Sequence, residues 1–140
     1  MNRTLPQNRF GNRFNCWCEI LSRSVIRLKI VKLDEAPSLE TVKGRHGVIL
    51  QSGKKVMMMI LTVEPGIPTP PHNHPHEQIG YLLEGRGVLF SGGESREIKA
   101  GTSFLIPPNE SHNFNAIGEK PAIIIDVFSP PRQDYLKKAK

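Results

Sequence analysis

The stretch that decides the fold is Gly66–Gly85, GIPTPPHNHPHEQIGYLLEG. It holds three of the chain's five histidines within five residues, His72, His74 and His76, followed by a short apolar run. In an extended chain, side chains two residues apart point to the same face. We therefore expect His72 and His74 to project together, as two ligands of one metal ion must.

Two further residues are candidate partners of this pair. Gln78 lies four residues beyond His74, an even separation that restores the same face if the strand stays regular, although Pro75 favours a bulge or corner between them. His112, in the distant segment PPNESHNF, could lie beside the others on an adjacent strand. Three imidazoles and one side-chain oxygen would form a site suited to a divalent transition metal.

Three other residues are interpreted as standing outside this set. His76 is also two residues from His74, but it would be a ligand only if Pro75 did not turn the chain. Glu77 should face away from Gln78, and it would reach the metal only if the strand register slipped by one. His46 lies far upstream among charged residues and is interpreted as a surface histidine.

Short apolar runs, separated by glycine, proline and asparagine, surround the histidine stretch. They are Val48–Leu50, Lys55–Gly66, Ile79–Gly87, Gly87–Glu94, Arg96–Gly101, Thr102–Glu110 and Pro121–Phe128. Runs this short, with a turn signal about every 8–12 residues, are typical of an all-β sandwich or barrel. Gly92-Gly93 predicts a hairpin turn. No helical periodicity intervenes before the tail, Gln133–Lys140.

The net charge of +6 is confined to the first part of the chain. Residues 1–32 carry seven basic side chains and one acid, and subtracting these from totals of 19 and 13 leaves 12 of each in residues 33–140. We therefore divide the chain into a basic N-terminal extension of uncertain order, 1–32, and a single barrel domain, 33–140. A neutral domain without a basic stripe argues against nucleic-acid binding. No apolar run approaches the roughly 18 residues of a membrane-spanning helix.

The extension has its own features. Cys16 and Cys18 are poor disulfide partners and too few for a zinc site, so we interpret them as free thiols in a reducing compartment, the cytoplasm. The arginine-rich, acid-poor composition is shared with transit peptides, and a poorly ordered extension or a start codon assigned too far upstream are alternatives. The alternation in Ile26–Leu33 could supply an edge strand.

Two segments together resemble the motifs of the cupin family. Gly66–Gly85 is similar to its first motif, G-x5-H-x-H-x3,4-E-x6-G, with Gln78 at the acid position. Gly101–Ala116, GTSFLIPPNESHNFNA, is similar to the second, G-x5-P-x-G-x2-H-x3-N, and the 15 residues between them match the short spacer of single-domain cupins. The resemblance implies an all-β cupin double-stranded β-helix, a jelly-roll barrel, with one divalent metal ion. It assigns the ligands His72, His74, Gln78 and His112.

Three departures from the motifs affect what the resemblance implies. Gln78 replaces an acid, so all four protein ligands would be neutral and the cation would keep its full charge as a harder Lewis acid. Asn109 replaces a turn glycine, which is tolerable because asparagine accepts left-handed backbone better than most residues. Ala116 replaces the final asparagine, which sits one place early at Asn115.

The segment DVFSPPRQDYL, Asp126–Leu136, resembles the C-terminal signature of pectin-degradation cupins. Those proteins convert ring-form 4,5-unsaturated uronates to open-chain keto acids, which implies a metal-dependent isomerase or tautomerase. The resemblance assigns the pocket residues Asp126, Phe128 and Arg132. Arg132 could pair bidentately with a substrate carboxylate, and Asp126 could shuttle a proton. Alternatively, SPPR only ends a strand and Asp126 only bonds nearby backbone.

The remaining expectations concern the interior, the metal and the partners. Apolar candidates for the barrel interior are Met57, Met59, Phe90, Phe104 and Phe114. The metal could be Zn, Ni, Mn, Fe or Cu, because three-histidine sites accept each according to supply. The partner is expected to be a small carboxylated molecule, and the resemblance implies a homodimer. Two other functions stay open: a different metal-dependent cupin enzyme such as a dioxygenase, although these commonly retain the acid that Gln78 replaces, or a non-catalytic ligand-binding cupin.

Overall fold

Nine strands and two short helices make up the part of the chain that the computed structural model describes, residues 28–140. The strands are β1 (Ser38–Val42), β2 (Arg45–Ser52), β3 (Met57–Val63), β4 (Glu77–Glu84), β5 (Arg86–Ser91), β6 (Glu94–Lys99), β7 (Thr102–Ile106), β8 (His112–Ala116) and β9 (Ala122–Ser129). The helices are the 3₁₀ turn η1 (Leu33–Glu35) and α2 (Gln133–Lys138). Within residues 28–140, neither helix has the length and apolarity needed to cross a membrane.

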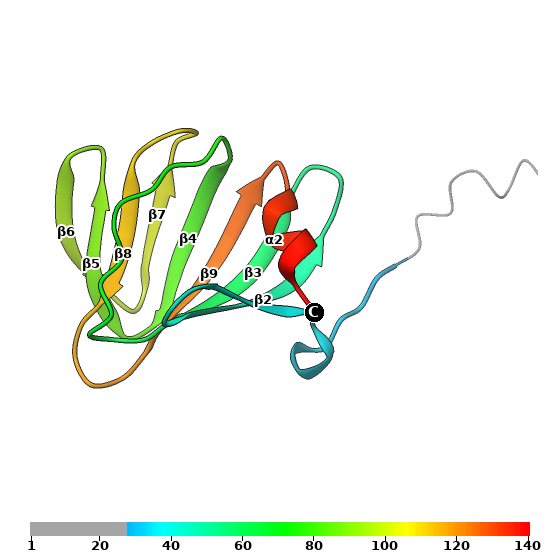
Figure 1. Ribbon diagram of the computed structural model, residues 1–140, viewed down its shortest axis with the longest axis horizontal. Helices are drawn as coiled ribbons and strands as arrows, with labels where there is room; N and C mark the ends of the chain where they lie inside the picture. The colour runs from blue at the N-terminus through cyan, green and yellow to red at the C-terminus, as the bar shows by residue number, and fades with distance from the viewer. Residues whose placement is uncertain (1–27) are drawn as a thin grey trace, which may run out of the picture. The chain divides into compact units, whose positions relative to one another are not determined.

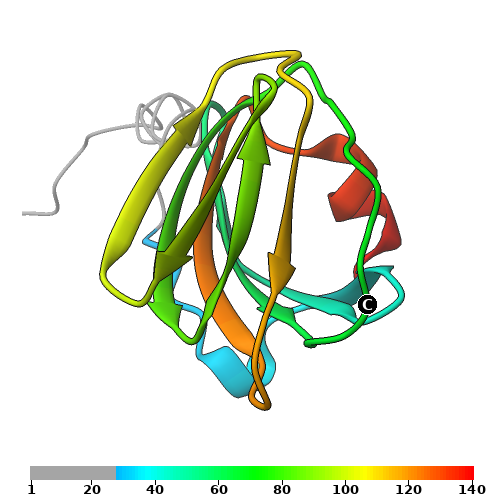
Figure 2. The same cartoon turned by 90° about the vertical axis from the view of Figure 1, so that its left-hand side faces the viewer.

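The strands form two antiparallel sheets. The larger has the order β1-β2-β3-β9-β4-β7 and the smaller has the order β6-β5-β8. β9 therefore lies between β3 and β4, in the middle of the larger sheet (Figure 1). The two sheets enclose a common interior, seen from the side in Figure 2. The predicted all-β jelly-roll barrel is confirmed.

Alternating side chains give each central strand an inner and an outer face. Burial alternates along β4 and again along β9, as the period of two requires. The register places Gly80 opposite Asp126 on the inner face. Gly80 has no side chain there, and the ring of Phe104 occupies the space that a Cβ would fill. The absence of one side chain thus makes room for an aromatic ring beside the central acid.

The predicted turn chemistry is also confirmed. Gly92 and Gly93 connect β5 to β6 as a two-residue hairpin, with φ angles of 59° and 85°. Both angles are in the left-handed region that glycine adopts without a steric cost. Asn109, which stands where the cupin motif has glycine, has a φ of 64°.

Apolar side chains fill the interior in two clusters, with a cavity between them. The first joins both sheets through Val63, Leu82, Phe114, Ala116, Ala122 and Ile124. The second lies on β1, β2, β3 and β9, with Leu39, Ile49, Met57, Met59 and Phe128, and α2 packs against it through Tyr135 and Leu136. Complete burial of a side chain such as Leu82 contributes about 1.5–3 kcal/mol.

Two details of the sequence interpretation are wrong. Within Ile26–Leu33, residues 28–32 form no strand and Leu33 begins η1, so β1 is the edge strand of the larger sheet on this side. Of the interior candidates, Met57 and Phe90 are not among the residues that line the cavity: Met57 is buried in the core, and Leu89, one position before Phe90 on β5, lines the cavity. Residues 1–27, with Cys16 and Cys18, lie outside the described residues, so the boundary at residue 32 and the cytoplasmic location stay predictions.

Candidate functional site

The cavity between the two apolar clusters has a volume of about 340 Å³. Its walls are mainly apolar, with polar groups gathered among them, as is usual for a small-molecule site. Besides three imidazoles and Gln78, the charged side chains that line it are Arg45, Asp126, Arg132, Asp134 and Lys138. The cavity therefore combines metal-ligand chemistry with acid–base groups and cations.

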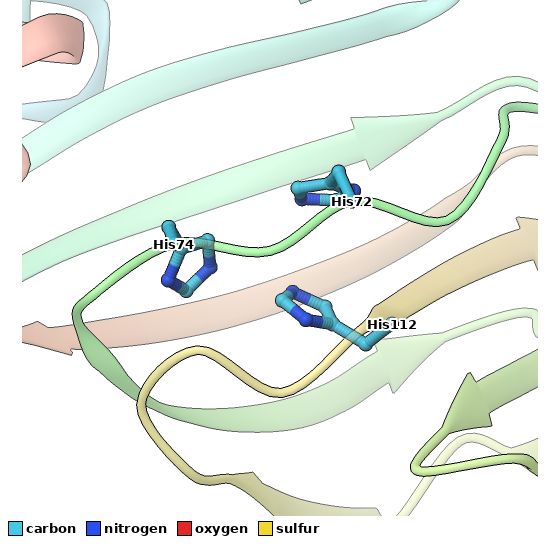
Figure 3. A group of neighbouring side chains, drawn as sticks. All are labelled: His72, His74 and His112. Atoms are coloured by element: carbon cyan, nitrogen blue, oxygen red, sulfur yellow. The ribbon is translucent and has the colours of Figure 1, made fainter.

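His72, His74 and His112 form a cluster in this cavity. Figure 3 shows the three rings turned toward one another, the first two on the segment that leads into β4 and the third at the start of β8. One ligand atom from each lies within 4.8 Å of the others. The ring centroids of His72 and His74 are 4.6 and 4.8 Å from that of His112. This spacing suits a shared metal ion.

The backbone holds the cluster in place. The N–H of His72 donates to the carbonyl of His112, and the N–H of His112 donates back, both at 2.9 Å. The N–H of Asn109, in its left-handed conformation, donates to the carbonyl of His74 at 2.7 Å. His72 and His112, 40 residues apart in sequence, are thus joined by an isolated antiparallel β-bridge.

The outward nitrogen atoms of two rings donate to carbonyl groups. His74 Nδ1–H donates to the carbonyl of His76 at 3.1 Å, and His112 Nδ1–H donates to that of Glu110 at 2.7 Å. Burial lowers the pKa of His72 and of His74 to about 4, and it also lowers the pKa of His112. The rings are therefore neutral at pH 7, and those of His74 and His112 keep a lone pair on Nε2. Such outer bonds are typical of metal-binding histidines.

The side-chain oxygen of Gln78 lies next to the histidine cluster. Its side-chain amide donates to Asp126 Oδ1 at 2.8 Å, which turns Oε1 toward His74 Nε2 at 3.2 Å. Both of these facing atoms are acceptors, because the proton of His74 is on Nδ1. A cation between them would satisfy both lone pairs. The residues present therefore fit a divalent cation.

The three residues that the sequence analysis placed outside the ligand set are positioned differently from the four expected ligands. His76 offers its backbone carbonyl to His74, and its own Nδ1 is buried without a partner among the described residues. Glu77 is exposed, whereas Gln78 is 8% exposed. His46 is exposed on β2. None of the three belongs to the described histidine cluster.

Asp126 lies at the centre of the larger sheet, 1% exposed. Burial raises its pKa to about 6, against the opposing effects of the Gln78 amide and of the positive charges of Arg45 and Arg132. A carboxyl group with a pKa near neutrality can both accept and return a proton. The hydrogen bond from the side-chain amide of Gln78 links this acid directly to one of the expected metal ligands.

Arg132 is held rigidly next to α2. Its Nε and Nη2 donate to the two carboxylate oxygens of Asp134 at 3.0 and 2.7 Å. Its guanidinium carbon lies 4.0 Å from the ring centroid of Tyr135 and 5.4 Å from that of Phe128. The edge that was expected to grip a substrate carboxylate is thus already engaged by Asp134. Phe128 also contacts His74 edge-on, with ring centroids 5.6 Å apart.

Sequence reasoning missed several residues that line the cavity, among them Arg45, Thr69 and Tyr135. For Arg45 a signal existed, since it stands in phase with the buried Ile49 on β2. The other two lie on a loop and on a short helix, where no strand periodicity indicates direction.

Comparisons with known proteins agree with this geometry. Residues 59–128 match the cupin domain family. The chain is 33% identical over 104 residues to the pectin degradation protein KdgF of Dickeya dadantii, which covers 74% of this chain and 94% of that protein. The structure of KdgF from Halomonas sp. has a TM-score of 0.70 at 28% identity, over 77% and 98% of the two chains. An RmlC-like cupin from Shewanella frigidimarina has the same TM-score at 25% identity, over 78% and 96%.

Proposed function

The chain belongs to the cupin family, and on that premise we propose that it is a metal-dependent enzyme that ketonises an unsaturated sugar acid. The observation that carries the proposal is the hydrogen bond between Gln78 and Asp126, which couples a metal-ligand candidate to a buried acid in one cavity. Similarity to a pectin degradation protein supports a uronate as the substrate class.

The proposed ligands are His72, His74, Gln78 and His112. A divalent cation held by them would supply Lewis-acid stabilisation of negative charge on a substrate oxygen. The neutral imidazoles and the amide oxygen would leave its charge undiminished. The chemistry of the donor set does not distinguish among Zn, Ni, Mn, Fe and Cu.

Asp126 is the proposed proton carrier. Opening the ring of an unsaturated uronate breaks the hemiacetal C–O bond and leaves an enol, and ketonisation moves the enol proton to the neighbouring carbon. One group that accepts and returns a proton meets this need, with no net gain or loss. The raised pKa of Asp126, about 6, and its enclosed position suit that task.

Arg132 and Phe128 are proposed to orient the substrate. Asp134 occupies the Nε–Nη2 edge of Arg132, so the opposite edge, with both N–H groups of Nη1 and the second N–H of Nη2, is left to donate to a substrate oxygen. The ring of Phe128, 3% exposed, forms an apolar wall next to His74. A fixed guanidinium and a flat wall would reduce the number of orientations available to a small sugar acid.

The test is turnover of a 4,5-unsaturated monouronate, followed by loss of its conjugated absorbance, with and without a chelator. Acceleration over the spontaneous reaction that the chelator abolishes is expected. No acceleration by fully metallated protein would contradict the proposal. Oxygen consumption dependent on added iron would instead favour a dioxygenase, and tight binding without turnover would favour a ligand-binding module.

We further propose that the protein is a homodimer in which two copies pack through the outer face of the larger sheet. The register aligns Ile60, Ile125 and Tyr81 across three neighbouring strands on this face. Ile79 and Leu105 are paired on the adjacent strands and are 49% and 57% exposed. A continuous apolar area is typical of an interface, and a flat face can pair with its own copy about a twofold axis.

A further inference from the structure

Arg45, at the start of β2, is a buried cavity residue that the proposed chemistry does not use. It is 7% exposed and lines the same cavity as His72 and Asp126. Arginine keeps its charge even when buried, so a partner is required. Among the described residues Arg45 forms no ion pair with a carboxylate, whereas Arg132 is paired with Asp134.

One nitrogen atom of Arg45 fixes the side chain. Nη2 donates to the backbone carbonyl of Phe114 on β8 and to the hydroxyl of Thr69. Thr69 is itself held, because its N–H donates to Asn115 Oδ1 at 3.0 Å and its carbonyl accepts from the side-chain amide of Asn113. The guanidinium of Arg45 therefore reaches from one sheet to the other in a defined position.

The other two nitrogen atoms of Arg45 have unused hydrogen-bonding capacity. Within residues 28–140, Nε is buried without a partner, and no hydrogen bond of Nη1 to a protein group is seen. Buried donors without an acceptor are rare in folded proteins, and each one calls for an explanation, such as a bound ion or water or a role in catalysis. A rigid, charged donor with nitrogen atoms to spare is suited to an anionic oxygen group.

We propose that Arg45 binds the carboxylate of the sugar acid, while Arg132 contacts an uncharged oxygen of the same molecule. This division follows from charge, because Asp134 forms a close ion pair with Arg132, whereas Arg45 interacts with Asp126 only beyond ion-pair distance among the described residues. It makes Arg45 the residue that selects an acid over the neutral sugar. The inference rests on the proposed function for the nature of the acid, but the contact itself can be tested without turnover.

The test compares binding of D-galacturonate and D-galactose to the zinc-loaded protein by calorimetry. The wild type is expected to bind galacturonate at least about tenfold more tightly, the scale of one charge-assisted bond. Arg45→Met should abolish this preference and leave galactose binding unchanged, and Arg45→Lys should retain part of it. Lys43→Met removes a charge from the exposed turn before β2 and should behave as the wild type. Equal preference in the wild type and in Arg45→Met, with matching circular dichroism and zinc content, would overturn the proposal.

A second measurement does not depend on the variants folding. Galacturonate should shift the ¹⁵N–¹H resonance of Arg45 Nε in the wild-type protein, and galactose should leave it in place. An unmoved resonance at saturating galacturonate would overturn the proposal. Failure of the proposed function has a different signature: the unsaturated uronate is not turned over, while the preference for galacturonate still depends on Arg45.

Discussion

The side-chain amide of Gln78 donates a 2.8 Å hydrogen bond to Asp126, and the two side chains lie on neighbouring strands of the larger sheet. A glutamate at position 78 could not donate this bond unless it were protonated. The amide therefore does two things at once: it turns its oxygen toward His74, and it gives a deeply buried carboxylate its one side-chain hydrogen bond in the described structure. The departure from the cupin motif is thus complemented by the acid on β9.

Replacing the buried acid should separate chemistry from metal binding. Asp126→Asn keeps the shape of the side chain but cannot carry a proton, so turnover of the unsaturated uronate should fall by about 10²–10⁴. Metal content, measured by mass spectrometry of the purified protein, should stay near that of the wild type. Glu77→Gln, one residue from Gln78 on the exposed face, is the matched control and should retain activity. An active Asp126→Asn protein would exclude Asp126 as the proton carrier.

Removing one imidazole should empty the histidine cluster. His112→Ala deletes a proposed ligand at the start of β8. Metal affinity should therefore fall by more than the loss of about 10–100-fold that is typical when a residue hydrogen-bonded to a ligand is removed. The barrel should still fold, since the bridge between positions 72 and 112 is made by backbone groups. His46→Ala, at an exposed position on β2, should leave metal content unchanged. Full occupancy in His112→Ala would show that the metal binds elsewhere.

The ion pair next to α2 should give a specific dependence of stability on pH. The bonds from Arg132 lower the pKa of Asp134 from 3.8 to about 2. A carboxyl group with a lowered pKa stabilises the folded state above its unfolded value and loses that contribution as pH falls toward the folded value. The difference in unfolding free energy between wild type and Asp134→Asn should therefore be complete at pH 7 and smaller at pH 3.

Denaturant unfolding at both pH values measures this difference. Glu35→Gln removes an exposed carboxylate that lies 3.3 Å from Lys32, and it should change stability little at either pH. An Asp134→Asn effect of equal size at pH 3 and pH 7 would mean that the ion pair is not its source.

A charge on the outer face of the larger sheet should separate the proposed dimer. Tyr81 is 42% exposed on β4, and Tyr81→Arg would place two like charges in the proposed interface. Light scattering after size exclusion should then give the mass of one chain, 15.7 kDa, rather than two. Val56→Arg, 52% exposed in the connection between β2 and β3, is the control and should stay dimeric. A monomeric wild type would contradict this part of the proposal.

The sequence predicted those features that depend on local spacing. The two-residue interval between His72 and His74 and the glycine pair before β6 each determine their geometry within a few residues. The Gln78–Asp126 bond and the Asp134–Arg132 pair were not predicted, although Asp126 and Arg132 were named. The first depends on which strands become neighbours. The second joins residues only two apart, but it depends on the side-chain conformations adopted where α2 begins. Arg45 was missed because arginine is rarely buried completely, although its phase with Ile49 on β2 indicated the inner face.

The backbone bridge between His72 and His112 has a practical consequence. Because backbone hydrogen bonds assemble the histidine cluster, the ion is not needed to bring its ligands together. The protein should therefore withstand stripping by a chelator and accept a different cation afterwards, without passing through an unfolded state. Metal identity then becomes a variable that an experimenter can choose, and one batch of protein, reloaded in turn, can rank the cations by the rate each supports.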